Sequence, residues 1–236
     1  KLKQAMADLK KANEGKGAGL YDFPWYAIIG PPGAGKTTAL LNSGLRFPLA
    51  ERHGPQALSG VGGTRNCDWW FTDNAVILDT AGRYTTQDSA ADVDKAGWQN
   101  FLKLLKDTRP RQPLNGVLLV FGLTDLLGLS ATERTAHARA VRTRLIELQE
   151  AFGVRLPVYL LFTKLDLLAG FADYYDDLDK DSREQVLGFT FPLDDSGRGD
   201  APWRKFGEYF DRLLARMDGR LPERLVLVNR RELRGI

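Results

Sequence analysis

The stretch Gly30-Pro-Pro-Gly-Ala-Gly-Lys36-Thr37 matches the pattern G-x-x-x-x-G-K-[ST]. It follows the apolar run Tyr26–Ile29 and opens a helical pattern, which is the context that this motif requires. A loop that wraps phosphates with backbone N–H groups needs small side chains, and the following helix N-terminus favours anions. We therefore predict a P-loop nucleotide-binding domain. Its expected nucleotide-binding residues here are Gly30, Pro31, Pro32, Gly33, Ala34, Gly35, Lys36, Thr37 and Thr38.

A second phosphate element follows at Val76-Ile-Leu-Asp79-Thr-Ala-Gly82. A carboxylate at the end of a buried strand beside the phosphate loop is where the magnesium shell needs an anion. We expect Asp79 and the Thr37 hydroxyl to hold Mg²⁺, Lys36 to reach the β- and γ-phosphates, and the Gly82 N–H to contact the γ-phosphate. Lys36, Thr37, Asp79 and Arg83 are the candidate catalytic residues.

Three positions bear on the class of nucleotide enzyme. Thr80 stands where many P-loop ATPases place a glutamate, and the D-x-x-G form resembles GTPases. Thr64, in a glycine-rich loop, resembles the switch I threonine that ligates magnesium, although an ordinary flexible loop would look alike. Arg83 stands where Ras-like GTPases have a glutamine, and it cannot accept a proton but could stabilise charge. Hydrolysis is thus expected to be slow, partner-dependent or absent, and a nucleoside triphosphatase activity stays open.

The element Thr163-Lys164-Leu165-Asp166 follows the apolar run Val158–Phe162 and resembles the guanine-reading motif [NT]-K-x-D. The Asp166 carboxylate can accept two hydrogen bonds from guanine, and the Lys164 stem can cover the base. Alone, the same residues would also suit a helix start with an aspartate near its N-terminus. We predict that Thr163, Lys164 and Asp166 bind GTP or GDP, with ATP or ADP as the alternative.

Short apolar runs alternate with helical patterns, which predicts an α/β fold with a mostly parallel sheet and helices on both faces. The expected strands are 26–29, 67–72 at a sheet edge, 75–78, 116–122, 158–162 and, as a weaker candidate, 186–191. The main expected helices are 37–43, 92–108 and 133–152, and apolar residues recur helically after Pro202. We predict an N-terminal helix and linker at 1–20, a GTPase-like domain at 21–200 and a C-terminal helical extension at 201–236.

Composition restricts the remaining classes. The net charge of +3 over 236 residues does not call for nucleic acid, whose readers carry a concentrated basic face. The single cysteine, Cys67, excludes an internal disulfide framework. The most apolar stretch, Val117–Leu129, is interrupted by Thr124 and Asp125 and is too short to span a bilayer. The chain opens without methionine, so we expect a soluble piece of a longer protein.

Several long blocks resemble the TssM/IcmF family of type VI secretion proteins. They are the segments 22–44, 60–71, 78–88 and 162–171, together with Arg109-Pro, Asn115-Gly-Val and Gly188-Phe-Thr-Phe-Pro192. The resemblance implies an NTPase-like domain on the cytoplasmic face of the bacterial inner membrane, between transmembrane segments that this chain lacks. It also implies TssL in the inner membrane, baseplate components, and the lipoprotein TssJ through an absent periplasmic part as partners.

Two functions remain open at this point. In the first, the domain is a nucleotide-dependent switch or slow triphosphatase that couples the membrane complex to the baseplate. In the second, the fold is a non-hydrolysing docking scaffold for other proteins. The aromatic pair Trp69 and Trp70 would serve either function if exposed, but we expect at least one of the two to pack in the core.

Overall fold

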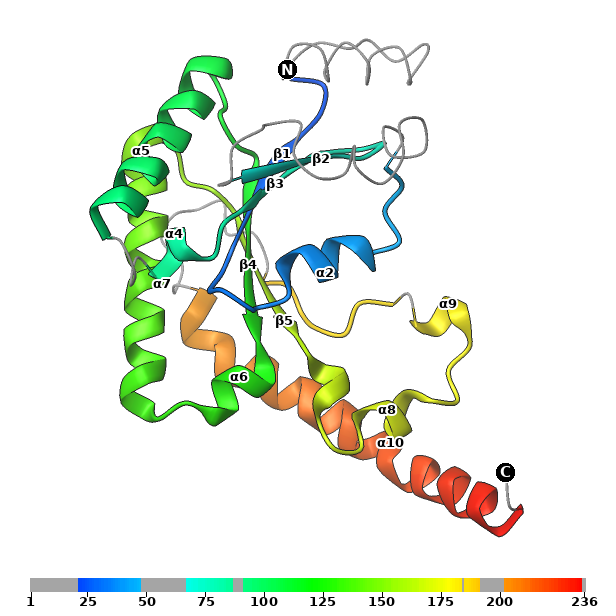
Figure 1. The fold of residues 1–236 in the computed structure, drawn as a ribbon. Coiled ribbons are helices and arrows are strands. Elements are labelled where there is room, and N and C mark those ends of the chain that lie inside the picture. Colours follow the sequence, from blue (N-terminus) through cyan, green and yellow to red (C-terminus); the bar gives the residue numbers. More distant parts are fainter. Residues whose placement is uncertain (1–20, 48–66, 87–90, 184, 192–201, 235–236) are drawn as a thin grey trace. The chain divides into compact units, whose positions relative to one another are not determined.

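A five-stranded sheet forms the centre of the chain, in the order β2-β3-β1-β4-β5 (Figure 1). The computed structural model describes residues 21–47, 67–86, 91–183, 185–191 and 202–234. Its strands are β1 (Trp25–Ile29), β2 (Cys67–Phe71), β3 (Val76–Thr80), β4 (Gly116–Gly122) and β5 (Val158–Thr163). All neighbours pair in parallel except β2 and β3. The predicted α/β class and mostly parallel sheet are confirmed, with β2 at an edge as expected.

Helices cover both faces of the sheet at its central strands, whereas the side chains of β5 are exposed or half-buried. On one face, α5 (Ala91–Thr108) and α7 (Ala131–Phe152) pack on an apolar cluster that includes Trp25, Leu78 and Val117. On the other, α2 (Lys36–Leu41) contributes Leu40 to a smaller cluster with Ile28 and Val120. Because β1, β3 and β4 are covered on both sides, their side chains are almost all buried, as parallel strands require.

Both tryptophans of the Trp69-Trp70 pair are buried, at 5% and 4% exposure. Successive strand residues point to opposite faces, so Trp69 joins the larger cluster and Trp70 the smaller one. The prediction that at least one packs in the core is confirmed, and neither offers a docking surface.

The helix α7 has well-formed ends. Ser130 and Glu133 make a reciprocal capping box at its start, and Gly153 ends it in the left-handed conformation. Two short helices, α4 (Arg83–Thr86) and α6 (Leu123–Gly128), follow β3 and β4 directly.

The chain divides into two compact units after Leu165. The second unit holds η2 (Leu165–Leu167, which begins at the boundary), α8 (Phe171–Tyr175), α9 (Lys180–Arg183), η3 (Pro202–Lys205) and α10 (Phe206–Arg234). The predicted domain limits at residues 20 and 200 fall at or in segments outside the described residues. The predicted N-terminal helix at 1–20 also lies outside the described residues, so the helix and both limits remain predictions. No helix in the described parts of the chain combines the length and the apolar character needed to cross a bilayer.

One predicted strand is wrong. Residues 186–191 form no strand in the second unit, where Phe189 and Phe191 instead pack their rings against Tyr209 of α10. Alternating aromatic residues suit a strand, but here both rings contact one helix, so helix packing rather than sheet pairing satisfies them. The amphipathic helix expected after Pro202 is α10.

Candidate functional site

Two glycines give the loop between β1 and α2 a left-handed backbone conformation. Gly33 and Gly35 adopt positive φ values of 74° and 78°, which side chains disfavour. Gly35 occupies the N-cap position of α2 without a side-chain cap, so the first N–H groups of that helix have no side-chain acceptor from their own cap. Such N–H groups point out of the helix end, where an anion can accept their hydrogen bonds.

Lys36 is folded back over this loop. Its ammonium donates hydrogen bonds of 2.9 Å to the Gly30 carbonyl and 3.1 Å to the Pro31 carbonyl. Burial lowers the pKa of Lys36, and the nearby Asp79 carboxylate opposes that shift. The lysine is thus held at the loop by weak neutral acceptors, which a phosphate oxygen could replace with a stronger, charge-assisted bond.

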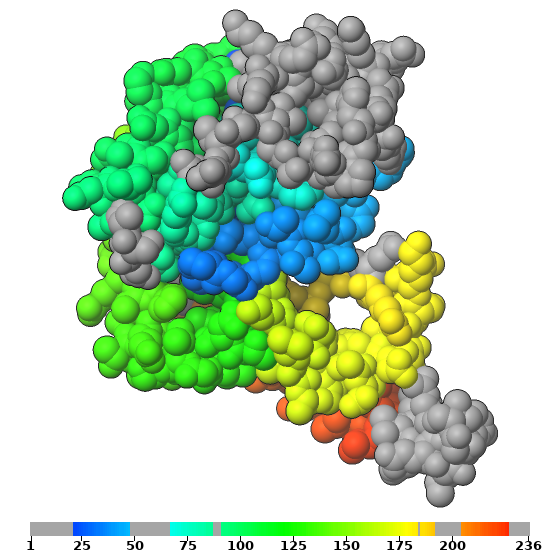
Figure 2. All heavy atoms as spheres, in the orientation of Figure 1, coloured from blue at the N-terminus to red at the C-terminus, as the bar shows by residue number. Residues whose placement is uncertain are grey.

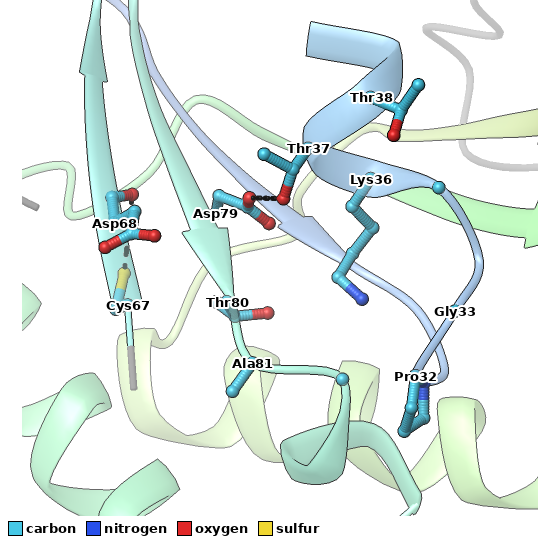
Figure 3. Close-up of a pocket in the computed structure, with 12 residues that line it drawn as sticks. Pro32, Gly33, Lys36, Thr37, Thr38, Cys67, Asp68, Asp79, Thr80 and Ala81 are labelled. Atoms are coloured by element: carbon cyan, nitrogen blue, oxygen red, sulfur yellow. Dashed lines mark hydrogen bonds between the residues drawn. The ribbon is translucent and has the colours of Figure 1, made fainter. Parts of the chain in front are cut away.

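Thr37 and Asp79 meet at the start of α2 (Figure 3). The Thr37 hydroxyl donates a 2.5 Å hydrogen bond to the Asp79 carboxylate. The parallel register of β1 and β3 pairs Ile28 with Asp79, which brings the end of β3 beside the loop. Burial raises the pKa of Asp79, while the Thr37 bond and the Lys36 charge lower it and Asp68 raises it.

These two oxygen-bearing side chains fit a nucleotide-bound magnesium ion. Among the described residues, no group of three or more His, Cys, Asp or Glu side chains could hold a metal by itself. Mg²⁺ usually takes only one or two carboxylates and completes its shell with waters and substrate phosphates. Thr37 and Asp79 therefore suit an ion that arrives with phosphates, and they do not form a protein-only cage.

A cavity of about 460 Å³ adjoins these groups. Its lining comes from the loop, the start of α2 and the ends of β2 and β3: Pro32, Gly33, Gly35, Lys36, Thr37, Thr38, Cys67, Asp68, Asp79, Thr80, Ala81 and Gly82. Figure 2 shows the segment that contains α2 at the molecular surface.

Cys67 and Asp68 were not predicted as site residues. They reach the cavity because β2 pairs antiparallel with β3, which places Asp68 opposite Asp79. Burial raises the pKa of Asp68, and it strongly raises that of the Cys67 thiol, with smaller contributions from both aspartates. The predicted edge strand at 67–72 was the only signal in the sequence that could have found them.

The segment after Asp79 lies against the phosphate loop. The Gly82 backbone packs so closely that a Cβ atom there would sit 2.4 Å from the Pro32 nitrogen. Thr85, which the sequence did not single out, accepts a 3.2 Å bond from the Gly30 N–H and donates a 3.1 Å bond to the Gly30 carbonyl. A movement of the loop would therefore also displace Thr85 and, with it, α4.

Arg83 lies apart from the cavity lining. Its Nε is 3.1 Å from the buried Asp94 carboxylate of α5, and the guanidinium also lies over the Tyr84 ring. Tyr84 is buried against Trp98 of the same helix as Asp94. This predicted catalytic residue thus links α4 to α5.

The predicted base-reading element is attached to the phosphate loop at its first residue. The Thr163 hydroxyl donates a 2.6 Å hydrogen bond to the Ala34 carbonyl. Lys164 donates to both oxygens of Asp125, at 2.8 and 2.7 Å. Asp166 is exposed and belongs to the second unit, and Thr64 lies outside the described residues. The structure thus brings together Lys36, Thr37, Asp79 and Gly82, with Thr163 beside them.

Comparison with known proteins identifies relatives of this chain. Residues 91–235 match the model of the IcmF-related N-terminal domain family. The chain is 54% identical over 227 residues to the type VI secretion system component TssM1 of Pseudomonas aeruginosa. The aligned region covers 95% of this chain and 21% of that protein, so the chain spans about a fifth of the relative's length.

Proposed function

Because this chain belongs to the TssM/IcmF family of type VI secretion system components, we propose that its first unit binds a nucleoside triphosphate with Mg²⁺. The observation that carries the proposal is the convergence of Lys36, Thr37 and Asp79 on one cavity at the start of α2. A lysine, a hydroxyl and a carboxylate in this arrangement are the groups that P-loop proteins use for phosphates and magnesium.

Each of these residues has a distinct role in the proposal. Lys36 exchanges its carbonyl partners, Gly30 and Pro31, for phosphate oxygens. Thr37 and Asp79, which are in contact with each other, would hold Mg²⁺. When bound, the ion neutralises the charge that the phosphates carry. The proposed nucleotide is GTP, as the sequence motif Thr163-Lys164-Leu165-Asp166 predicts, with ATP as the alternative.

The contacts of α4 support a switch role. Thr85 and the preceding Gly82 contact the loop between β1 and α2, while Arg83 and Tyr84 contact α5. A change at the γ-phosphate would thus reach α5 through one short helix. A switch needs an element whose position differs with the ligand, and α4 is well situated to be that element.

A specific observation favours the second candidate, a docking scaffold that does not hydrolyse nucleotide. Arg83 is engaged with Asp94 and does not line the cavity. Hydrolysis without a charge-stabilising arginine is slow in related phosphoryl-transfer sites. We therefore include slow or absent turnover in the proposal, together with the location that the family resemblance implies, at the cytoplasmic face of the inner membrane beside TssL and the baseplate.

The test is a calorimetric titration of the chain with non-hydrolysable GTP and ATP analogues in Mg²⁺. Lys36→Ala should weaken binding about 10- to 100-fold, the usual value of charge-assisted hydrogen bonds. Lys103→Ala, which removes an exposed lysine of α5, is the matched control and should bind as the wild type does. Asp166→Ala should weaken guanine binding alone.

The outcomes separate the alternatives. Tight guanine binding that is lost in Lys36→Ala and Asp166→Ala supports the GTP site. Equal binding of both analogues, unaffected by Asp166→Ala, assigns the site to ATP as well. Binding of neither analogue by the wild-type chain would overturn the nucleotide proposal and leave the scaffold.

A further inference from the structure

Asp125 and Lys164 form an ion pair beside the phosphate site that nothing in the nucleotide motifs requires. Asp125 lies in the first turn of α6, after β4, and Lys164 follows β5. The strand register pairs Gly122 with Thr163, so the ends of β4 and β5 bring the two charged residues together. Both oxygens of Asp125 accept bonds from the Lys164 ammonium, at 2.8 and 2.7 Å.

The unusual backbone conformation of Lys164 indicates that its surroundings fix the position of this residue. Its φ is +61°, and it is the one non-glycine residue with positive φ in the described part of the chain. A lysine in the left-handed region costs conformational free energy, and such residues persist where the surroundings determine them, often at ligand sites. The preceding residue, Thr163, is fixed to the Ala34 carbonyl by its hydroxyl.

Gly122 makes the space that the pair occupies. A Cβ atom at this position would lie 2.2 Å from an Asp125 carboxylate oxygen and 3.1 Å from Cδ of Lys164. Any larger residue would therefore displace the carboxylate or the lysine stem. Three features therefore favour one arrangement of the Lys164 side chain. They are the space left by Gly122, the left-handed backbone of Lys164 and the contact of its ammonium with both Asp125 oxygens.

The pair lies next in sequence to a contact with the loop that precedes α2 and does not line the cavity. Neither residue is among those that line the cavity, yet Lys164 is one residue from Thr163, which touches the loop at Ala34. Since Asp125 occupies most of the donor capacity of the ammonium and neutralises its charge, Lys164 is poorly suited to recruit phosphate. Its methylene stem remains as an apolar surface beside the site.

We propose that Asp125 is a positioning residue for base binding, which holds the Lys164 stem where it covers one face of the nucleotide base. This inference rests on the proposed nucleotide site and adds a residue to it. Asp125 does not touch the phosphates or Mg²⁺ and acts only through Lys164. Its effect should therefore appear with ligands that carry a base and vanish with ligands that do not.

The experiment compares a Mg²⁺–nucleoside triphosphate analogue with Mg²⁺–tripolyphosphate, which presents the phosphates alone. Asp125→Ala should weaken nucleotide binding about two- to fivefold, the range for a partly exposed ion pair, and leave tripolyphosphate binding unchanged. Asp107→Ala is the matched control because it removes an exposed aspartate that pairs with Lys103 on α5. It should change neither affinity.

A second variant tests whether Asp125 acts through Lys164. Lys164→Met keeps an apolar stem without a charge, so adding Asp125→Ala to it should cause no further loss of nucleotide affinity. Equal weakening of nucleotide and tripolyphosphate would overturn the inference, because the pair would then only support the loop. If Asp125→Ala leaves nucleotide binding unchanged, the inference about Asp125 is wrong but the proposed function stands. If the wild-type chain binds neither ligand, the proposed function and the inference are both wrong.

Discussion

Thr37 and Asp79, 42 residues apart in the chain, are joined by a hydrogen bond of 2.5 Å from the Thr37 hydroxyl to the Asp79 carboxylate. The contact connects the first turn of α2 to the end of β3, and both residues line the same cavity. It brings together two of the three expected magnesium ligands, Thr37 and Asp79. The first prediction concerns this pair.

Asp79→Asn should remove the magnesium dependence of nucleotide binding. An amide is a much weaker ligand for Mg²⁺ than a carboxylate, so affinity in Mg²⁺ should fall about 10- to 100-fold. Affinity in excess EDTA should stay near the wild-type value. Titrations in both conditions check this, with Asp92→Asn, an exposed aspartate of α5, as control. A similar loss with and without Mg²⁺ would show that Asp79 acts on folding or on the loop instead.

Gly82→Ala should destabilise the fold by about 1–3 kcal/mol, the usual cost of overpacking. The added Cβ would meet the Pro32 backbone at 2.4 to 2.6 Å, and a backbone segment held by Thr85 cannot move aside cheaply. Urea unfolding measures the change. Gly128→Ala is the matched control, since its Cβ meets nothing within 4 Å and should leave stability unchanged or slightly higher. Equal stability of the two variants would contradict the close packing.

Removing the charge of Arg83 and removing the charge of Asp94 should lower the free energy of unfolding by different amounts. Asp94 is 3% exposed and one of its carboxylate oxygens has no hydrogen-bond partner, whereas the Arg83 side chain is 44% exposed. Arg83→Met therefore leaves a buried carboxylate without its cation and should cost about 1–3 kcal/mol. Asp94→Asn leaves an arginine that water can solvate and should cost less. Chemical denaturation of both variants tests the order, and a larger loss in Asp94→Asn would refute this account.

Cys67 should react slowly with thiol reagents in the folded chain. Burial raises the pKa of its thiol, so at about pH 8 the reactive thiolate is scarcer than for an exposed cysteine. Because the chain has one cysteine, a disulfide-exchange dye reports this residue alone. We expect slow labelling in buffer and rapid labelling in urea. Rapid labelling of the folded chain would show that the cavity end of β2 opens readily.

The capping box of α7 should make stability depend on pH. Hydrogen bonds from the Ser130 side chain and backbone lower the pKa of Glu133. A carboxyl whose folded pKa is lowered contributes stability above its unfolded value of about 4.3, and that contribution is lost as the pH falls through the folded value. The thermal unfolding midpoint of the wild type should therefore fall more steeply below about pH 4.3 than the midpoint of Glu133→Gln. Glu150→Gln, at the exposed end of α7, should follow the wild type.

Local patterns predicted the sheet well because its strands are short and apolar and are bounded by helical patterns or, between β2 and β3, by a turn. The expected strands that became β1 to β5 were correct within two residues at each end, and β4 matched in full. The failure at 186–191 has a tertiary cause. Phe189 and Phe191 alternate as strand residues do, but their rings pack on a helix, α10. Alternation alone cannot tell which kind of neighbour will cover an apolar residue.

The residues of the candidate site also fall into those that the sequence predicted and those that depend on tertiary structure. Lys36, Thr37 and Asp79 were predicted from motif and order, because the phosphate chemistry demands those residue types there. Cys67 and Asp68 were not, because their place depends on β2 running antiparallel to β3. Thr85 was also missed, since nothing in its own segment indicates that it bonds to Gly30, 55 residues earlier.

The amino-acid sequence by itself determined the glycine-rich loop between β1 and α2, the strand–helix alternation and the family, because each of these depends on residues close together in the chain. Only the tertiary structure decided which partners the charged residues take. Arg83 reads as a catalytic arginine in sequence and pairs with Asp94 in the fold, and Lys164 reads as a base-binding lysine whose partner, Asp125, is 39 residues away. The physical reason is that a motif specifies a side chain and its local backbone, whereas an ion pair is specified by strand order and register, which bring distant segments together.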